Sequence, residues 1–593
     1  MDAPTEHEAT TAEPETLSVA VRWTVGVVSA GALAAVAWIL SRRPLTDYDL
    51  PWNLAMGRVV VATRSIPRVD DLAFTHGPLR YVEVLGDTFF YGVEHTFHER
   101  GLQWVGALAA AGTVAATFAR MRKSGPVAYL VAAWLAAATA QWFTVRPATL
   151  SLLFLPLGLL VVDRHRERPS DWKRLLPLVP LAFVWANVHG MVALFAALLV
   201  AYAVVSLFES RRSGAGTRRT SMAVVACALA ALSAASVNTF GPALLLGPLR
   251  GDEVLGGITE WARPSLGYFF ADVPVATAFV VFALLAVGLG REPDGRRALP
   301  LFDVVVLALA LAGFVSVVRL TPLAAILVAP LAARRLGSWI PETNLVGVAA
   351  AVAPAAAAAY VALFIPTTEL AGFDPTRFPV AATNFVERML PAGRMYDFMP
   401  FGGYLAYRLH PTYRVFNDGR NTLARSADFV KRAERAGTDA AAFDGVVRNY
   451  GLEWAMTTSK DREVHDVPLA RSAEWQMVFL DDVAAVYVRR EGPNAKLARY
   501  GYRALRHLVE PAGLLRESMH DGPVATALGH DGALALLQAP DSPRACFIAA
   551  VGGIAAKDAS LFGKGVEQLA RLSPSHPALS ALENAWSVRN GRP

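Results

Sequence analysis

The chain has 593 residues, of which 54% are hydrophobic and 18% are charged, and its mean hydropathy is +0.35. Soluble domains carry about 25% charged residues, so the composition excludes a wholly soluble protein. The net charge of +6 does not indicate nucleic-acid binding, because basic residues gathered on one side of a bilayer explain it.

Long apolar runs dominate the first two thirds of the chain. Apolar stretches of about 18 residues or more predict transmembrane helices, although several runs here are short or contain proline. Residues 1–21 contain several acids and no basic n-region, so we expect a disordered cytoplasmic tail and not a cleavable signal peptide. Cys227 and Cys546 are not expected to pair. The eleven candidate spans are 22–41, 101–119, 126–144, 147–162, 175–188, 190–208, 221–237, 273–290, 301–318, 320–333 and 345–365.

The loops between these runs alternate in their content of basic residues. One set of loops holds 17 Lys and Arg residues, and the other short loops hold 4. The positive-inside rule places the basic set in the cytoplasm, which puts the N-terminus inside and the C-terminal part outside. The first outer loop is then 42–100, and Arg42 and Arg43 run against the rule there. The basic loops are 120–123, 164–174, 211–219, 291–297 and 334–335.

The composition changes after the bundle, which we expect to cover residues 22–366. Residues 367–492 mix β-prone and helical runs and predict an extracytoplasmic α/β domain, with strands at 413–416 and 475–480. Asp481-Asp482 stands before a further β-prone run, 483–488, and predicts a hairpin turn. Helical patterns cover roughly 424–436 and 438–449.

Residues 493–593 predict a helical tail. Two Pro-x-x-Pro segments, beginning at Pro540 and Pro574, lie 34 residues apart. This spacing is the tetratricopeptide period, although other positions of that motif do not match. A short helical cap with proline-terminated helices explains the pattern equally well.

Polar residues recur at the helix ends that this topology places outside. Ionisable groups this close to hydrocarbon are costly and usually face a bundle interior or a watery cavity. Carboxylates, a histidine and two arginines on one side could build a site for an anionic substrate. These residues are Asp47, Asp49, Arg146, Asn187, His189, Asn238, Glu260 and Arg319.

Each of these residues also has a purely structural explanation. Arg146 and Arg319 could mark the ends of spans, and His189 could lie in a turn with its hydrogen bonds satisfied. Asp47 could be a turn residue, and Asp49 could make a structural hydrogen bond. Their joint clustering is stronger evidence than any one residue. The sequence contains no P-loop, no dinucleotide-binding glycine motif, no metal-ligand spacing and no nucleophile elbow.

The segments around these residues resemble the GT-C superfamily of membrane glycosyltransferases, in a bacterial branch. The resemblance covers roughly residues 22–490, and it departs from that branch at Asn53, where we would expect His. The Trp-Trp-Asp run of oligosaccharyltransferases is missing before Gly402, which argues against peptide glycosylation. The matching motifs are Asp47-x-Asp49, Ile66-Pro67-Arg68-x-Asp70, Arg146-Pro147, Trp185-Ala186-Asn187-x-His189-Gly190, Glu260-Trp261, Phe401-Gly402-Gly403-Tyr404-Leu405 and Val415-Phe416-Asn417-Asp418-Gly419-Arg420.

The resemblance implies a polyprenyl-phosphate sugar donor and an acceptor, an envelope protein or glycan, outside the bacterial cytoplasmic membrane. Asp47 or Asp49 would act as general base, or the pair would help to hold Mg²⁺ or Mn²⁺. Arg319, Arg146 or His189 would neutralise the departing phosphate. Asn187 and Glu260 complete the expected substrate-binding residues.

Two other classes of function stay open at this stage. The bundle could be a non-catalytic scaffold that presents the α/β domain and the helical tail to envelope proteins. It could also be a lipid or sugar transporter, although transporters tend to place their sites near the midplane of the membrane and not at one face.

Overall fold

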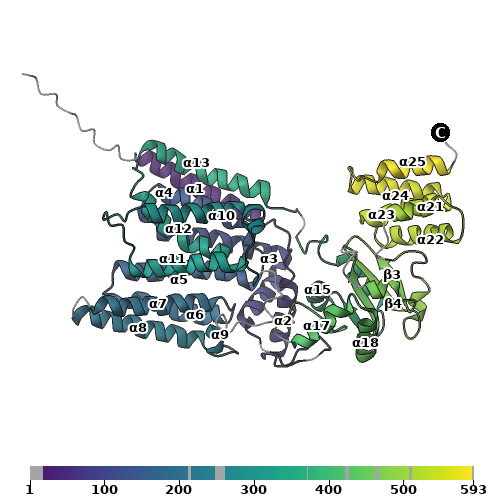
Figure 1. Ribbon diagram of the computed structural model, residues 1–593, viewed down its shortest axis with the longest axis horizontal. Helices are drawn as coiled ribbons and strands as arrows, with labels where there is room; N and C mark the ends of the chain where they lie inside the picture. The colour runs from purple at the N-terminus through teal and green to yellow at the C-terminus, as the bar shows by residue number, and fades with distance from the viewer. Residues whose placement is uncertain are drawn as a thin grey trace, which may run out of the picture. The chain divides into compact units, whose positions relative to one another are not determined.

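The computed structural model describes residues 18–590, apart from residues 76, 80, 212–214, 247–260, 370, 421–425, 461–466 and 507–510. The chain forms two compact units (Figure 1). The first consists of Met1–Leu45 with Tyr81–Gly372, and the second of Thr46–Arg80 with Phe373–Pro593. The segment 42–100, which we expected to be an outer loop of the bundle, is therefore divided between the two units.

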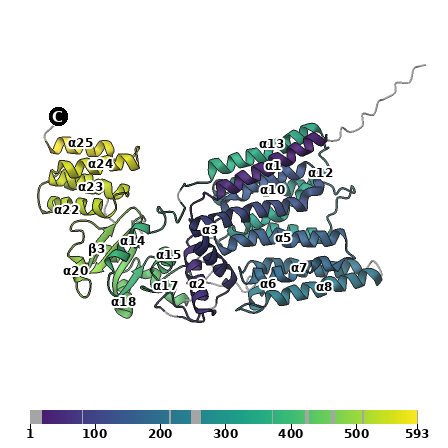
Figure 2. The ribbon, with the colours of Figure 1, turned by 180° about the vertical axis from the view of Figure 1, so that it is seen from behind.

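The first unit is a bundle of helices that run side by side (Figures 1 and 2). Its apolar runs form helices because a helix satisfies its own backbone hydrogen bonds, as the interior of a bilayer demands. The helices are α1 (Val19–Leu40), α3 (Val84–Met121), α4 (Val127–Thr139), α5 (Pro147–Glu167), α6 (Leu178–Ala186), α7 (Val192–Ser210), α8 (Ala215–Ala235), α9 (Ala243–Leu246), α10 (Pro274–Leu289), α11 (Leu301–Ser316), α12 (Thr321–Gly337) and α13 (Asn344–Phe364).

Seven helices among the described residues are long and apolar enough to cross a membrane, so the protein is an integral membrane protein. Shorter apolar helices, including α10 and α11, accompany them. The expected span 175–188 corresponds to α6, whose nine residues cover only about 14 Å of a hydrocarbon layer that is about 30 Å thick. The full count of eleven spans therefore stays a prediction. The most buried of the seven helices is α12, which packs against α4, α10 and α11.

Ion pairs join one end of this bundle. Arg166, on α5, lies 2.7 Å from Asp303, on α11, and Arg334, on α12, lies 2.5 Å from the same carboxylate. Arg120, on α3, lies 2.7 Å from Asp163, on α5. These ion pairs join the helix ends that lie next to the basic loops. At their other ends, α5 begins just after Arg146 and α12 begins just after the turn that contains Arg319.

The second unit contains a four-stranded sheet with the order β1-β2-β4-β3. β1 and β2 are parallel, whereas β4 is antiparallel to both β2 and β3. Strands β2, β3 and β4 are almost entirely buried, in keeping with the mainly apolar sequences of β3 and β4. The strands are β1 (Arg394–Asp397), β2 (Leu452–Thr458), β3 (Trp475–Leu480) and β4 (Ala484–Arg489), and the helices are α2 (Leu50–Thr63), α14 (Val380–Met389), α15 (Met399–Leu409), α17 (Ala427–Ala436), α18 (Ala440–Tyr450), α19 (Val467–Arg471) and α20 (Ala495–Ala498).

The expected hairpin at Asp481-Asp482 is confirmed. The Asp481 carboxylate accepts the backbone N–H groups of Val483 (2.8 Å) and Ala484 (2.7 Å), which closes the turn between β3 and β4. The expected strand at 413–416 is wrong. Val415 makes only an isolated bridge with Ala73, because its pairing partner is one short loop segment and not a strand.

The helical tail follows the sheet with α21 (Pro511–Ser518), α22 (Pro523–Gln538), α23 (Pro543–Ala556), α24 (Ala559–Leu572) and α25 (Leu579–Arg589). Glycines allow close contact here: a Cβ added at Gly552 would lie 2.9 Å from the Cα of Gly532. Pro543 opens α23, where its missing N–H costs nothing. Membership of the tetratricopeptide class stays a prediction.

Candidate functional site

Polar side chains meet around His189 at one end of the helix bundle. His189 lies in the short connection between α6 and α7, and its Nε2 lies 3.1 Å from Arg319 Nη2 and 3.7 Å from Glu83 Oε1. Its Nδ1 lies 3.3 Å from Ser151 Oγ, which in turn accepts the indole N–H of Trp185 at 2.9 Å. The histidine is thus held on both sides of its ring.

Two arginines stand just before helices that have a proline among their first two residues. Arg146 precedes Pro147, the first residue of α5, and its backbone is extended because a residue before proline avoids the helical region. Arg319 lies in the single 3-10 turn Val318–Leu320, which connects α11 to α12. Helix N-termini carry a partial positive charge, so the two guanidinium groups and the two helix starts reinforce one another.

Contacts from a distant segment fix the position of Arg319. The hydroxyl of Tyr268 donates to the carbonyl of Val318 (3.1 Å), and the N–H of Val318 donates to the carbonyl of Ala262 (3.1 Å). These bonds bring Trp261 to the guanidinium of Arg319, which lies 5.7 Å from the centroid of the indole ring. Such a cation–π contact holds the guanidinium group of an arginine in place.

His189 is neutral in this arrangement. Arginine can only donate hydrogen bonds, so the contact with Arg319 requires an Nε2 atom that carries no proton. Burial, together with the guanidinium groups of Arg319 and Arg146, holds the pKa of His189 well below its usual range. Arg146 and Arg319 then outweigh the carboxylate of Glu83, and the cluster suits an anion.

Asn187 has a structural part in this cluster. Its backbone carbonyl accepts the N–H groups of Leu85 (2.9 Å) and Gly86 (3.4 Å) at the start of α3. Its side chain donates to the carbonyl of Val237 at 2.9 Å. Asn187 therefore joins the start of α3 and the end of α8 beside His189. Glu260 lies outside the described residues.

Sequence reasoning missed Glu83 and Ser151. Glu83 lies within the segment that we expected to be an outer loop. The one feature that could have indicated its role is its position immediately before α3. Ser151 lies inside the apolar helix α5, where a serine one turn after Arg146-Pro147 carries no pattern of its own.

Asp47 and Asp49 belong to the second unit, where Asp49 immediately precedes α2. The N–H of Asp49 donates to Asp47 Oδ1 at 3.0 Å, and Asp49 Oδ1 accepts the indole N–H of Trp52 at 3.1 Å. Gly419 lies against this turn, since an added Cβ would be 3.1 Å from Asp49 Oδ1. The motif glycine thus allows the close approach of the carboxylate.

A buried charge triad supports the same segment. Arg420 lies 2.9 Å from Asp70 Oδ1 and 2.6 Å from Asp418 Oδ2, and all three side chains are at most 1% exposed. The two carboxylates raise the pKa of Arg420. The triad joins the residues after α2 to the Asn417–Arg420 loop, 350 positions later in the chain.

A resident metal ion is not supported by the side chains that the structure describes. Within those ranges, no group of three or more His, Cys, Asp or Glu residues lies close enough to hold one. Hard divalent cations require six or more oxygen ligands, and one oxygen of Asp47 and one of Asp49 already accept hydrogen bonds. The divalent cation expected at these residues stays a prediction, and we derive no step through it.

Comparison with known proteins gives a likeness of fold. No protein-family model and no curated protein matches the chain. The arabinofuranosyltransferase AftD from Mycobacteria is similar, with 15% identity, a TM-score of 0.52, and coverage of 81% of this chain and 41% of AftD. The chain therefore spans less than half the length of AftD.

Two further solved structures are similar at lower scores. The archaeal oligosaccharyltransferase AglB from Archaeoglobus fulgidus, in complex with an inhibitory peptide and a dolichol-phosphate, has 10% identity and a TM-score of 0.47, over 74% of this chain and 69% of AglB. ArnT from Cupriavidus metallidurans, bound to undecaprenyl phosphate, has 14% identity and a TM-score of 0.47, over 79% of this chain and 98% of ArnT. The comparison with AftD shows that the fold of this protein resembles that of AftD.

Proposed function

We propose that the protein is a membrane glycosyltransferase that moves a sugar from a polyprenyl-phosphate donor to an acceptor on the outer face of the cytoplasmic membrane. The observation that carries the proposal is the contact of Arg319 with neutral His189 and with Trp261 at one end of the bundle. A held guanidinium at a helix start is suited to a phosphate group. The likeness of fold to AftD, an arabinofuranosyltransferase, supports the same class of reaction.

In the proposed reaction, an acceptor hydroxyl attacks the anomeric carbon of the donor sugar. A new C–O bond forms while the bond between that carbon and the phosphate oxygen breaks, and polyprenyl phosphate leaves with the bonding electron pair. Arg319, with Arg146, stabilises the negative charge that develops on the phosphate. Asp47 or Asp49 accepts the proton of the acceptor hydroxyl.

The proposal is tested with the purified full chain in lipid nanodiscs. A first assay measures the binding of a polyprenyl phosphate, and a second measures its release from polyprenyl-phosphate sugars. We expect Arg319→Gln to lower turnover by about 10²–10³-fold, as the loss of one donor to a developing charge does elsewhere. Arg263→Gln, an exposed arginine near Trp261, is the matched control and should retain activity.

The acidic residues are tested in the same assays. Asp47→Asn or Asp49→Asn should lower turnover by about 10²–10⁴-fold, the usual contribution of a general base. Asp71→Asn, which changes an exposed carboxylate in the same segment, is the control. Full transfer activity in both the Asp47 and Asp49 variants would exclude these residues as the base. A wild-type chain that does not bind polyprenyl phosphate would overturn the proposal.

The helical tail favours one alternative, a scaffold for envelope proteins. Helices α22, α23 and α24 pack in sequence order, as the units of a helical repeat do. A scaffold requires neither the Arg319–His189 contact nor turnover. Unchanged polyprenyl phosphate binding in Arg319→Gln, together with no release of polyprenyl phosphate by the wild type, would favour this alternative.

A further inference from the structure

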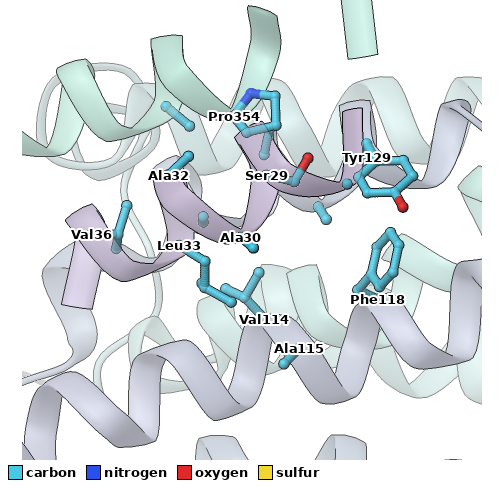
Figure 3. A pocket seen from close by; sticks show the side chains of 15 residues that line it. Ser29, Ala30, Ala32, Leu33, Val36, Val114, Ala115, Phe118, Tyr129 and Pro354 are labelled. Atoms are coloured by element: carbon cyan, nitrogen blue, oxygen red, sulfur yellow. The ribbon is translucent and has the colours of Figure 1, made fainter. Parts of the chain in front are cut away.

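The first unit contains two adjacent pockets between its helices. The first pocket has a volume of about 260 Å³ and is lined by apolar residues of α1, α3, α4 and α13 (Figure 3). Figure 3 shows Leu33 of α1 near Val114 of α3, and Phe118 of α3 near Tyr129 of α4. The described lining contains no Asp, Glu, Lys or Arg side chain.

The second pocket has a volume of about 250 Å³ and is lined by the C-terminal ends of α4 and α13, by Arg43 after α1 and by the start of α10. On α4, Ala136 lines the first pocket and Ala137 the second. On α13, Ala357 lines the first pocket and Tyr360, one turn later, lines the second. The lining therefore changes from apolar to polar in one direction along the bundle.

The second pocket contains charges of both signs. Arg43 lines it, and the guanidinium group is held by the backbone carbonyl of Gln141 at 2.9 Å. Asp272, which is exposed at the start of α10, lines the same pocket. Tyr360 and Phe364, whose ring centroids are 4.6 Å apart, add the aromatic lining that is typical of the level of lipid headgroups.

The length of the apolar part matches one leaflet of a bilayer. On α1 it extends from Gly26 to Val36, which corresponds to about 15 Å at 1.5 Å per residue. The hydrocarbon core of a bilayer is about 30 Å thick, so one acyl chain occupies about half of this depth. Arg43 follows the end of α1, where the headgroup of such a lipid would lie.

We propose that these two pockets bind one aminophospholipid, a lipid whose headgroup carries a phosphate and an ammonium group. An acyl chain occupies the apolar pocket, Arg43 binds the phosphate, and Asp272 binds the ammonium group. The pair of opposite charges favours this headgroup over an anionic one, because an anionic lipid would meet the carboxylate of Asp272 without a counter-charge. The site does not include Arg319 or His189.

The proposal is tested by native mass spectrometry of the full chain, purified and then exposed to phosphatidylethanolamine, phosphatidylglycerol or a polyprenyl phosphate. We expect the wild type to retain one phosphatidylethanolamine about tenfold more strongly than phosphatidylglycerol, the value of one charge-assisted hydrogen bond. Asp272→Asn should abolish this preference, whereas Arg43→Gln should weaken the retention of both phospholipids. Arg22→Gln, at the other end of α1, removes the same charge as Arg43→Gln and is the control for that loss.

Two glycines of α1 provide a matched test of the apolar pocket. A Cβ added at Gly26 or at Gly31 meets no atom within 4 Å, and of these two glycines only Gly26 lines the pocket. Gly26→Leu should lose the retained lipid, and Gly31→Leu should keep it.

Three results would overturn the proposal: equal retention by the two glycine variants, equal retention of the two phospholipids by the wild type, or a preference of this pocket for polyprenyl phosphate. Arg319→Gln should retain phosphatidylethanolamine like the wild type. A failure of this site is therefore distinguishable from a failure of the proposed transferase reaction.

Discussion

Replacement of Arg420 tests whether the charge triad of the second unit is structural. Arg420→Gln leaves the carboxylates of Asp70 and Asp418 buried, 0% and 1% exposed, with no guanidinium between them. Breaking a buried ion pair by removing one partner costs about 3–5 kcal/mol, because the remaining charge is buried without compensation. The second unit is large, and a domain of 150–250 residues loses roughly 2–4 °C of melting temperature per kcal/mol.

We therefore expect the second unit of Arg420→Gln to melt roughly 6–20 °C below that of the wild type. Near-UV circular dichroism of the full chain in detergent measures this, since Trp454 and Trp475 are buried in its sheet. The matched control is Arg414→Gln, which removes an exposed pair with Asp71. Surface pairs contribute at most about 1 kcal/mol, so this variant should melt close to the wild type.

A second variant separates the effect of an uncompensated buried charge from the effect of a smaller side chain at position 420. The triple variant Asp70→Asn, Asp418→Asn and Arg420→Met removes all three charges and should recover most of the stability, because neutral replacements of a buried triad are often tolerated. If Arg420→Gln has the same melting temperature as Arg414→Gln, the triad does not stabilise the unit, and the Asn417–Arg420 motif requires another explanation.

Two further predictions concern the sheet and its nearest loop. Burial raises the pKa of Asp481 to about 6, so the folded state binds the proton more tightly than the unfolded state does. The contribution of Asp481 to the free energy of unfolding should be largest below about pH 4 and fall by roughly 3 kcal/mol as the pH rises through 6, and thermal unfolding of the wild type against Asp481→Asn measures this. Gly402→Ala should strongly destabilise the unit, because the new Cβ would overlap the Asn417 carbonyl oxygen, whereas Gly445→Ala, with open space around it, should be neutral or stabilising by the same measurement.

The sequence predicts best those features that depend on local pattern. Hydropathy locates the helices of the bundle, and the β-prone runs on either side of Asp481-Asp482 locate a hairpin whose residues are neighbours in the chain. The alternation of basic and less basic loops predicts that Arg146, His189 and Arg319 lie at one end of the bundle. The structure places Arg319 in contact with His189.

Features that depend on distant contacts could not be predicted in this way. The run 413–416 has strand composition, but its pairing partner is Ala73, and composition does not reveal that only one bridge forms. The segment 46–80 belongs with the C-terminal part because Arg420 binds Asp70, 350 positions away. Glu83 joins the His189 cluster because Asn187 binds the start of α3, which no periodic pattern indicates.

The neutral state of His189 links pH to the proposed phosphate site. The pKa of His189 lies below its ordinary value, so the folded state binds fewer protons than the unfolded state in the window below pH 6.5. The stability that the Arg319 contact contributes is present above this window and is lost as the pH falls through it. Protonated His189 would place two cations 3.1 Å apart, measured between Nε2 and Arg319 Nη2.

A phosphate bound at this cluster would add negative charge beside the histidine and raise the pKa of His189. We therefore expect a polyprenyl phosphate to raise the melting temperature of the full chain more at pH 5 than at pH 7.5. Glutamine can accept from Arg319 and does not titrate, so His189→Gln should remove this difference while it keeps the stabilisation at pH 7.5. An equal dependence on pH in the wild type and in His189→Gln would show that the phosphate does not bind beside His189.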